Sequence, residues 1–195
     1  MRKTKDTVVT FEPAEENEER GTKKLWRIIY EWSDSLVIAI IAVFLVFAFV
    51  FRIATVKGGS MNPTLNDGDW LAVKAINTEI KRGDIIIITQ PNSLNEPLVK
   101  RVIALGGDEV DINFSEGTVT VNGNVLYEPY IAESTMRQFD IAFPITVPNG
   151  CYFVMGDNRN NSIDSRSNVV GFIKYGYILG TAEARLIPFG DFRVE

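Results

Sequence analysis

The sequence predicts an all-β, antiparallel domain that follows one N-terminal transmembrane helix. Two observations carry this prediction: one uncharged apolar stretch near the N terminus, and a long remainder of short β-branched or alternating segments separated by turn residues. The 195-residue chain is 46% hydrophobic and 23% charged, as folded proteins are. We therefore expect a cytoplasmic, partly disordered tail over residues 1–27, an anchor helix over residues 28–52 and an extracytoplasmic β-rich domain over residues 53–195.

The anchor is predicted from residues 35–51, which contain no charged side chain. As a helix this stretch spans about 25 Å, and the apolar residues before it extend it to the length of a bilayer crossing. Basic side chains precede it at Arg20, Lys23, Lys24 and Arg27 and follow it at Arg52 and Lys57. This bias predicts a cytoplasmic N terminus and a C-terminal domain outside the cytoplasmic membrane, with membrane lipid as a partner.

The chain after the anchor is predicted to form short strands. They are expected over residues 70–76, 84–89, 98–104, 109–112, 151–155 and 177–186. A hairpin is expected over residues 118–127, because Asn122-Gly123 is a preferred two-residue hairpin turn. No comparable helical period appears, so this part of the chain is predicted to be antiparallel β-sheet with long loops.

Composition excludes several classes of function. The net charge of −5, with scattered Lys and Arg, argues against a nucleic-acid partner. The chain has no histidine and one cysteine, Cys151, so neither a zinc site nor an internal disulfide is expected. We expect no metal and no organic cofactor, and the sequence leaves the oligomeric state open.

The absence of histidine also limits serine chemistry. A serine nucleophile needs a base, and without imidazole that base must be another group such as a lysine amine. The chain offers the turn Gly59-Ser60-Met61-Asn62-Pro63-Thr64, the β-patterned run Val99-Lys100-Arg101-Val102, and a polar segment over residues 156–166. A neutral Lys100 requires desolvation, which its apolar sequence neighbours favour.

These three segments, in this order behind an apolar helix, resemble the type I signal peptidases of peptidase family S26. Members of that family are membrane-anchored serine–lysine proteases that remove signal peptides from exported precursor proteins. Ser60 matches the nucleophile in the family's Ser-Met-x-Pro-Thr motif, and Lys100 matches the general base in its Lys-Arg motif. Residues 156–166 match Gly-Asp-Asn-Arg-x-Asn-Ser-x-Asp-Ser-Arg in full. The resemblance implies the β fold that these enzymes share with repressor-type proteases.

The resemblance also implies supporting roles for the polar segment. Ser162 would hydrogen-bond and orient the Lys100 amine, and Asp164 and Arg166 would form an ion pair near the site. Asp157 and Asn158 would hold the loop. The resemblance thus implies a membrane-bound serine endopeptidase whose partners are precursors bearing signal peptides.

Substrate contacts follow from the same resemblance. The family requires small substrate residues one and three positions before the cut, which enter shallow apolar pockets. The candidate contacting residues are Val56, Gly58, Met61, Leu65 and Val99. Gly58 stands where many members have a serine whose hydroxyl helps bind the oxyanion, so here the oxyanion hole is expected to use backbone N–H groups, that of Ser60 first.

Two alternatives compete with the peptidase interpretation. A catalytically silent, membrane-anchored binding module would need neither the nucleophile nor the base, and the retention of Ser60, Lys100 and Ser162 argues against it. A self-cleaving repressor-type protease would carry a DNA-binding region where this chain has an apolar helix. The sequence therefore favours a signal peptidase.

Overall fold

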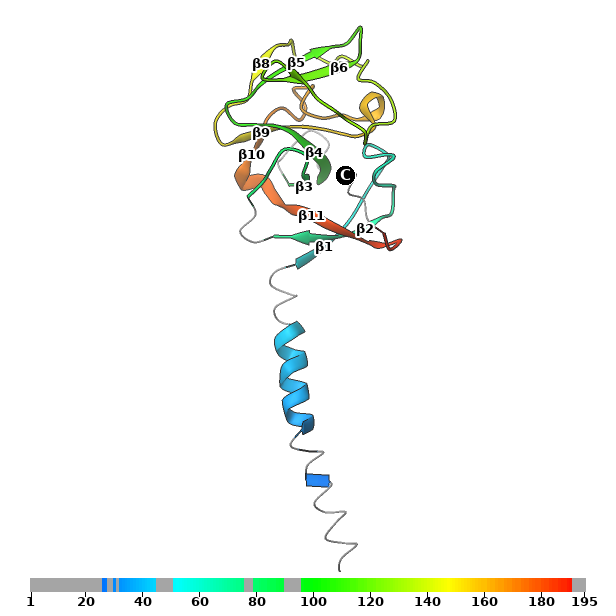
Figure 1. The fold of residues 1–195 in the computed structure, drawn as a ribbon, viewed down its shortest axis with the longest axis vertical. Helices are drawn as coiled ribbons and strands as arrows, with labels where there is room; N and C mark the ends of the chain where they lie inside the picture. Colours follow the sequence, from blue (N-terminus) through cyan, green and yellow to red (C-terminus); the bar gives the residue numbers. More distant parts are fainter. Residues whose placement is uncertain are drawn as a thin grey trace, which may run out of the picture. The chain divides into compact units, whose positions relative to one another are not determined.

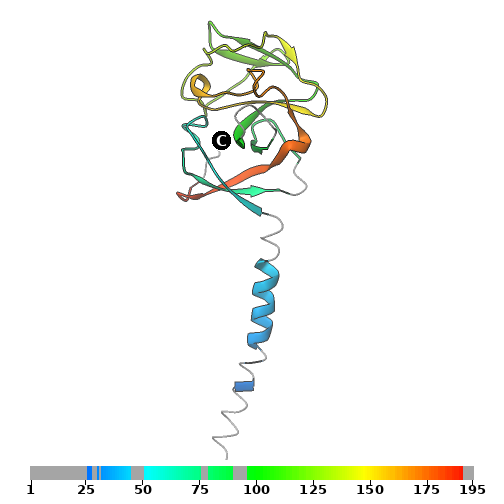
Figure 2. The same cartoon turned by 180° about the vertical axis from the view of Figure 1, so that it is seen from behind.

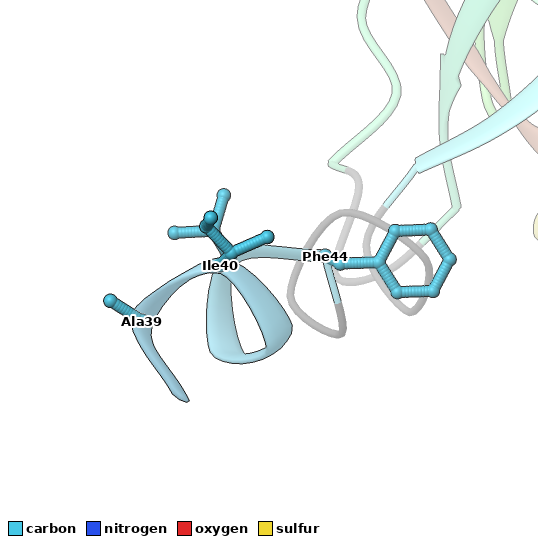
Figure 3. A pocket seen from close by; sticks show the side chains of 4 residues that line it. Ala39, Ile40 and Phe44 are labelled. Atoms are coloured by element: carbon cyan, nitrogen blue, oxygen red, sulfur yellow. The ribbon is translucent and has the colours of Figure 1, made fainter. Parts of the chain in front are cut away.

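The computed structural model describes residues 26–27, 30, 32–44, 51–75, 79–89 and 96–190. The chain divides into two compact units, residues 1–48 and residues 49–195. The first unit contains a helix over residues 32–44, drawn in blue in Figure 1, and its side chains from residue 34 onward are exposed. Ala39, Ile40, Val43 and Phe44 line an apolar hollow on this helix (Figure 3), which contains no polar side chain for chemistry.

The predicted anchor is described only in part. Residues 35–44 are helical, as expected, whereas residues 45–50 lie outside the described residues. Among the described residues, no helix combines the length and the apolar character that a membrane crossing requires. The predicted end of the anchor at residue 52 is wrong, because Phe51 and Arg52 already belong to a strand that pairs in the β-sheet.

The second unit is built on a seven-stranded sheet in which every pairing is antiparallel. In spatial order its strands are β1 (Phe51–Thr55), β2 (Trp70–Lys74), β11 (Ile178–Ile187), β3 (Ile85–Ile88), β4 (Leu98–Leu105), β9 (Cys151–Met155) and β10 (Ile173–Lys174). In Figures 1 and 2, β1, β2 and β11 lie at one end of this unit. Strands β3, β4 and β9 occupy its middle.

A smaller antiparallel sheet forms the other end of the unit. Its strands, in spatial order, are β7 (Asn124–Val125), β6 (Thr118–Val121), β5 (Glu109–Asn113) and β8 (Ile145–Thr146). The predicted hairpin is confirmed: β6 and β7 pair across Asn122 and Gly123, whose φ angles of 52° and 76° suit a type I′ turn. No strand of the small sheet pairs with one of the large sheet among the described residues, and one hydrophobic cluster that includes Phe153 of β9 and Val110 of β5 packs the two sheets together.

Strand β3 explains how the large sheet is held. It consists of four buried isoleucines. Ile85 and Ile87 pack into one hydrophobic cluster and Ile86 and Ile88 into another, because side chains alternate between the two faces of a strand. The sheet therefore has a core on each face, and strand β4, paired to β3, runs between them.

The antiparallel β prediction is confirmed for this unit. Each expected strand overlaps an observed one, with ends that coincide or differ by at most two residues. The sequence analysis missed β1, of which it assigns Phe51 and Arg52 to the anchor, as well as the two-residue strands β8 and β10 and two short 3₁₀ helices, Arg159–Asn161 and Tyr175–Tyr177. Segments of two or three residues are too short to show a hydrophobic period, so no sequence signal marks them.

Candidate active site

Ser60 lies in the turn that follows β1, and the residues beside it fix that turn. The backbone N–H of Asn62 donates to the Gly59 carbonyl at 3.2 Å, and that of Leu65 donates to the Met61 carbonyl at 2.9 Å. The side chains of Met61 and Leu65 are fully buried in the same hydrophobic cluster. The apolar residues anchor the turn and leave Ser60 half-buried at its surface.

Lys100 comes from the middle of β4 and reaches this turn. Its Nζ donates a hydrogen bond to Ser60 Oγ at 2.7 Å, across 40 positions of sequence. The lysine is only 2% exposed, and in the sheet it is paired with the fully buried Ile86. A hydroxyl and an amine thus lie within proton-transfer distance in a site that excludes most water.

Burial changes the acid–base character of Lys100. The pKa of its amine is lowered from 10.5 to about 8, chiefly by desolvation and to a smaller extent by the charge of Arg166. The carboxylates of Asp164 and Asp157 oppose this shift and hold the pKa up. The net result is an amine that is neutral in a substantial fraction of molecules near pH 8, as a general base must be.

The polar segment after β9 lies against the Ser60 turn, and Gly156 makes that approach possible. A Cβ atom at Gly156 would overlap the Ser60 carbonyl oxygen and the Ser162 side chain. Ser162 is therefore next to the Ser60 backbone and is 2% exposed. Its hydroxyl has no hydrogen-bond partner among the described residues, so the expected bond to the Lys100 amine is not formed in this structure.

Asp164 and Arg166 form the expected ion pair, and it is buried rather than exposed. Arg166 Nε donates to Asp164 Oδ1 at 2.8 Å and Nη2 donates to Oδ2 at 2.9 Å, with both side chains fully buried. Asp164 Oδ2 also accepts the backbone N–H of Gly156 at 3.0 Å. This pair ties the far end of the segment to the glycine that faces Ser60.

Asp157 joins three separate parts of the chain. Its carboxylate accepts two hydrogen bonds from Arg101, at 2.8 and 2.7 Å, and one from the Thr64 hydroxyl. Arg101 follows Lys100 on β4, and Thr64 lies four residues after Ser60. One buried carboxylate therefore fixes the strand that carries Lys100 relative to the turn that carries Ser60.

Asn158 binds the backbone around Ser60 directly. Its side-chain Nδ2 donates to the Gly59 carbonyl at 2.9 Å, and its backbone N–H donates to the Ser60 carbonyl at 3.0 Å. Asp157 and Asn158 were expected to hold the loop. Both bond to the segment around Ser60: Asp157 to Thr64, and Asn158 to the Gly59 and Ser60 carbonyls.

The predicted substrate-contacting residues divide into two groups. Val56, Met61 and Leu65 are at most 2% exposed and belong to the core cluster beneath the turn, so in this structure they offer almost no surface to a substrate, contrary to the prediction of substrate contact. The physical reason is that their side chains are used to anchor the turn. Val99 is half-buried and Gly58 is exposed, so these two keep surface for a ligand.

Several residues of the site were missed by the sequence analysis. Arg159 is fully buried, and its guanidinium donates to Glu128 and to the Thr135 hydroxyl. The ring of Tyr130 lies 4.0 Å from the Arg101 guanidinium carbon. Arg101 and Arg159 stand inside the quoted motifs and could have been found there. Residues 128–135 carry no signal, because their contacts with the motif depend on the fold.

The site's side chains are those of nucleophilic rather than metal chemistry. Within the described part of the chain, no group of three His, Cys, Asp or Glu residues could hold a metal ion. A hydroxyl, an amine of lowered pKa and buried ion pairs around them can carry out acyl transfer.

Several known proteins are similar to this chain. Residues 29–187 match the family model described as signal peptidase, peptidase S26. A signal peptidase I of Bacillus licheniformis is 39% identical over 90% of this chain and 97% of its own length. Signal peptidase I T of Bacillus subtilis is 38% identical over 91% of this chain and 95% of its own. A solved signal peptidase I from Enterococcus faecalis is 32% identical and aligns with a TM-score of 0.46, over 54% of this chain and 98% of that one.

Proposed function

This chain belongs to the signal peptidase family, peptidase S26, as a serine endopeptidase, and on that premise we propose that Ser60 is its nucleophile and Lys100 its general base in signal-peptide removal. One observation carries the assignment. Lys100 Nζ lies 2.7 Å from Ser60 Oγ, in a setting that lowers the pKa of the amine to about 8.

The proposed acylation step moves one proton and one electron pair. The neutral Lys100 amine takes the Ser60 hydroxyl proton while Oγ bonds to the carbonyl carbon of the scissile peptide, and the carbonyl electron pair moves onto its oxygen. The carbon–nitrogen bond then breaks, and the Lys100 ammonium gives its proton to the departing amine. Water repeats the sequence on the acyl-enzyme, with Lys100 again as the base.

The charge on the carbonyl oxygen needs a hydrogen-bond donor. We assign this role to the backbone N–H of Ser60, which makes no hydrogen bond among the described residues. Gly58 has no side-chain donor, and its own N–H donates to Asp67 at 2.7 Å. The oxyanion hole of this chain therefore depends on the peptide that precedes Ser60.

The polar segment supplies the support in this proposal. Asp164 and Arg166 hold Gly156, Asp157 holds Arg101, and Ser162 lies beside the Ser60 backbone with a free hydroxyl. The unpaired Ser162 oxygen is able to accept an N–H of the Lys100 amine, which leaves the single lone pair of the neutral amine for the Ser60 proton. Ser162→Ala should accordingly lower kcat by less than the loss of Ser60 or Lys100 does.

The cellular setting is also part of the proposal. We place the catalytic unit outside the cytoplasmic membrane and the N terminus in the cytoplasm, supported by the uncharged residues 35–51 and the four basic side chains before them. Protease added to spheroplasts should then cut the β-rich unit and spare the N-terminal tail. Digestion of the tail with protection of the β-rich unit would reverse the topology.

Cleavage of a precursor tests the central assignment. The full chain in detergent should cut a purified precursor once, directly after its signal peptide, as mass spectrometry of the products can determine. Ser60→Ala should retain the fold, judged by circular dichroism, and lose cleavage. A Ser60→Ala protein that cuts at the parental rate would remove Ser60 as nucleophile, and a folded parent that cuts no precursor would leave a binding module.

A further inference from the structure

Asn158 holds both peptide units that flank the nucleophile. Its side-chain amide donates to the Gly59 carbonyl at 2.9 Å, and its backbone N–H donates to the Ser60 carbonyl at 3.0 Å. These carbonyls belong to consecutive peptides, one on each side of the Ser60 Cα. A single residue, almost a hundred positions away in sequence, thus bonds to the backbone before and after Ser60.

The peptide held by the side chain is the one that matters for charge stabilisation. The Gly59 C=O and the Ser60 N–H are in the same planar unit, and in a trans peptide they point in opposite directions. Fixing the carbonyl therefore fixes the direction of the N–H. The Ser60 N–H makes no hydrogen bond within the described part of the chain, so it is available to a ligand.

Few other groups near Ser60 could bind the oxyanion or hold the Gly59 carbonyl. Gly58 has no side-chain hydroxyl, and its N–H is bonded to Asp67. Within the turn itself, only Asn62 N–H donates to the Gly59 carbonyl among the described residues, at 3.2 Å. Asn158 is thus the donor that connects this carbonyl to the rest of the fold, and it comes from a loop that buried ion pairs hold on both sides.

We propose that the Asn158 side chain is a positioning residue for the oxyanion hole: it orients the Gly59–Ser60 peptide so that the Ser60 N–H points at the developing oxyanion. This inference rests on the proposed function of Ser60. The Asn158 hydrogen bond orients the Ser60 N–H, whose partner is the substrate carbonyl oxygen. That oxygen gains its negative charge only as the reaction proceeds, so loss of the bond affects the chemical step more than substrate binding.

The role predicts a particular kinetic pattern. Removing an oxyanion donor outright costs about 10²- to 10³-fold in kcat, and misdirecting one costs less. For Asn158→Ala we expect kcat to fall about 10- to 100-fold, with KM unchanged within about twofold. The pH profile should keep its midpoint near 8, since Asn158 is not among the groups that shift the Lys100 pKa.

A matched pair of variants separates donation from packing. Asn158→Asp keeps the size and shape of the side chain but replaces the donor with an acceptor that faces a carbonyl, so it should be at least as slow as Asn158→Ala at the plateau of its own pH profile. Asn124→Ala is the control: it removes a hydrogen bond of 3.2 Å from a side-chain amide to the Asn122 carbonyl, in the β6–β7 turn. That variant should keep the parental kcat.

A second measurement reports the oxyanion directly. A peptide aldehyde that copies the substrate residues before the cut adds the Ser60 oxygen to its carbonyl carbon and so places an oxygen in the oxyanion position. Its inhibition constant should rise in Asn158→Ala by the same factor as kcat falls. The corresponding peptide alcohol, which has no such oxygen, should bind the variant and the parent equally.

The outcomes are distinguishable. Parental kcat in the aspartate variant, or equal aldehyde affinity in the parent and Asn158→Ala, would overturn the role of Asn158 and leave the nucleophile assignment intact. If Ser60→Ala itself cleaves precursor, the proposed function fails first. Loss of fold in Asn158→Ala, seen as a lowered melting temperature with KM and kcat both changed, would make the residue structural.

Discussion

Two buried basic side chains, Lys100 and Arg101, follow one another on β4, and they differ in whether a carboxylate binds them. Arg101 is bound by both oxygens of Asp157 at 2.8 and 2.7 Å and lies over the ring of Tyr130. Lys100 is more deeply buried, at 2% exposure against 8%, and its hydrogen bond goes to the neutral hydroxyl of Ser60. Among the ion pairs of the described residues, none includes Lys100.

The difference decides which cation can do chemistry. A paired guanidinium keeps its charge and serves as a structural tie. A buried amine without a bonded carboxylate is desolvated, and the more distant Asp164 and Asp157 only partly restore its preference for the charged form. The same strand thus carries a fixed cation, Arg101, and an amine of lowered pKa, Lys100, to which we assign proton transfer.

The largest expected effect comes from replacing Lys100 with arginine, the residue that follows it on β4. Lys100→Arg should lower kcat by about 10²- to 10⁴-fold, because a guanidinium keeps its proton and cannot accept one from Ser60. Cleavage of a precursor by the full chain measures it, with circular dichroism as the control for folding. A variant that cuts at close to the parental rate would remove Lys100 as the base.

The second prediction breaks the pairing of Arg101. Asp157→Asn leaves a buried guanidinium facing a neutral amide and should lower the free energy of unfolding by about 3 to 5 kcal/mol. Thermal unfolding measures the change. Arg82→Ala is the control, since its ion pair with Asp108 at 3.0 Å is exposed on the arginine side and is worth about 1 kcal/mol or less. Equal small losses in both variants would contradict the contrast.

The third prediction concerns the energetic cost of the desolvated amine. Between about pH 8 and 10.5 the unfolded lysine holds a proton that the folded one has lost, so the stability of the parent rises with pH in this window. Lys100→Met lacks this term and should be more stable than the parent by about 1 to 3 kcal/mol at pH 7, with the gain shrinking toward pH 10.5.

Two measurements check this sign. Unfolding of parent and Lys100→Met should be followed at pH 7, 8.5 and 10, and the difference should decrease at each step. In parallel, kcat/KM of the parent should rise with pH through about 8, as Lys100 loses its proton. A stability difference that stays constant with pH would mean that the amine is not desolvated in the folded chain.

The smallest expected effect is at Gly58, the position of the missing side-chain donor. Its φ of 74° strains any residue with a Cβ by about 1 to 2 kcal/mol, although no atom would contact that Cβ. Gly58→Ser should therefore fail to raise kcat and should lower kcat/KM by less than tenfold. Gly58→Asn, which tolerates this conformation better, should lose less. A faster serine variant would show that a side-chain donor outweighs the strain.

The sequence alone predicted six strands of the β-rich unit and the hairpin at Asn122-Gly123, and the resemblance of its three motifs to signal peptidases singled out Ser60 and Lys100. These features depend on local patterns, turn chemistry and the absence of histidine, all of which are visible in a linear chain. Asp164 and Arg166 could be paired from the motif, but spacing alone could not distinguish an exposed pair from the fully buried one observed.

Only the tertiary structure decided how these residues act. It buried Val56, Met61 and Leu65 under the turn, paired Arg101 with Asp157, and brought Asn158 to the Gly59 carbonyl. It also set Lys100 in the sheet beside Ile86, where desolvation lowers the amine's pKa. Burial and long-range hydrogen bonds arise when strands distant in sequence pack together, and the pKa of a lysine depends on that packing rather than on its sequence neighbours.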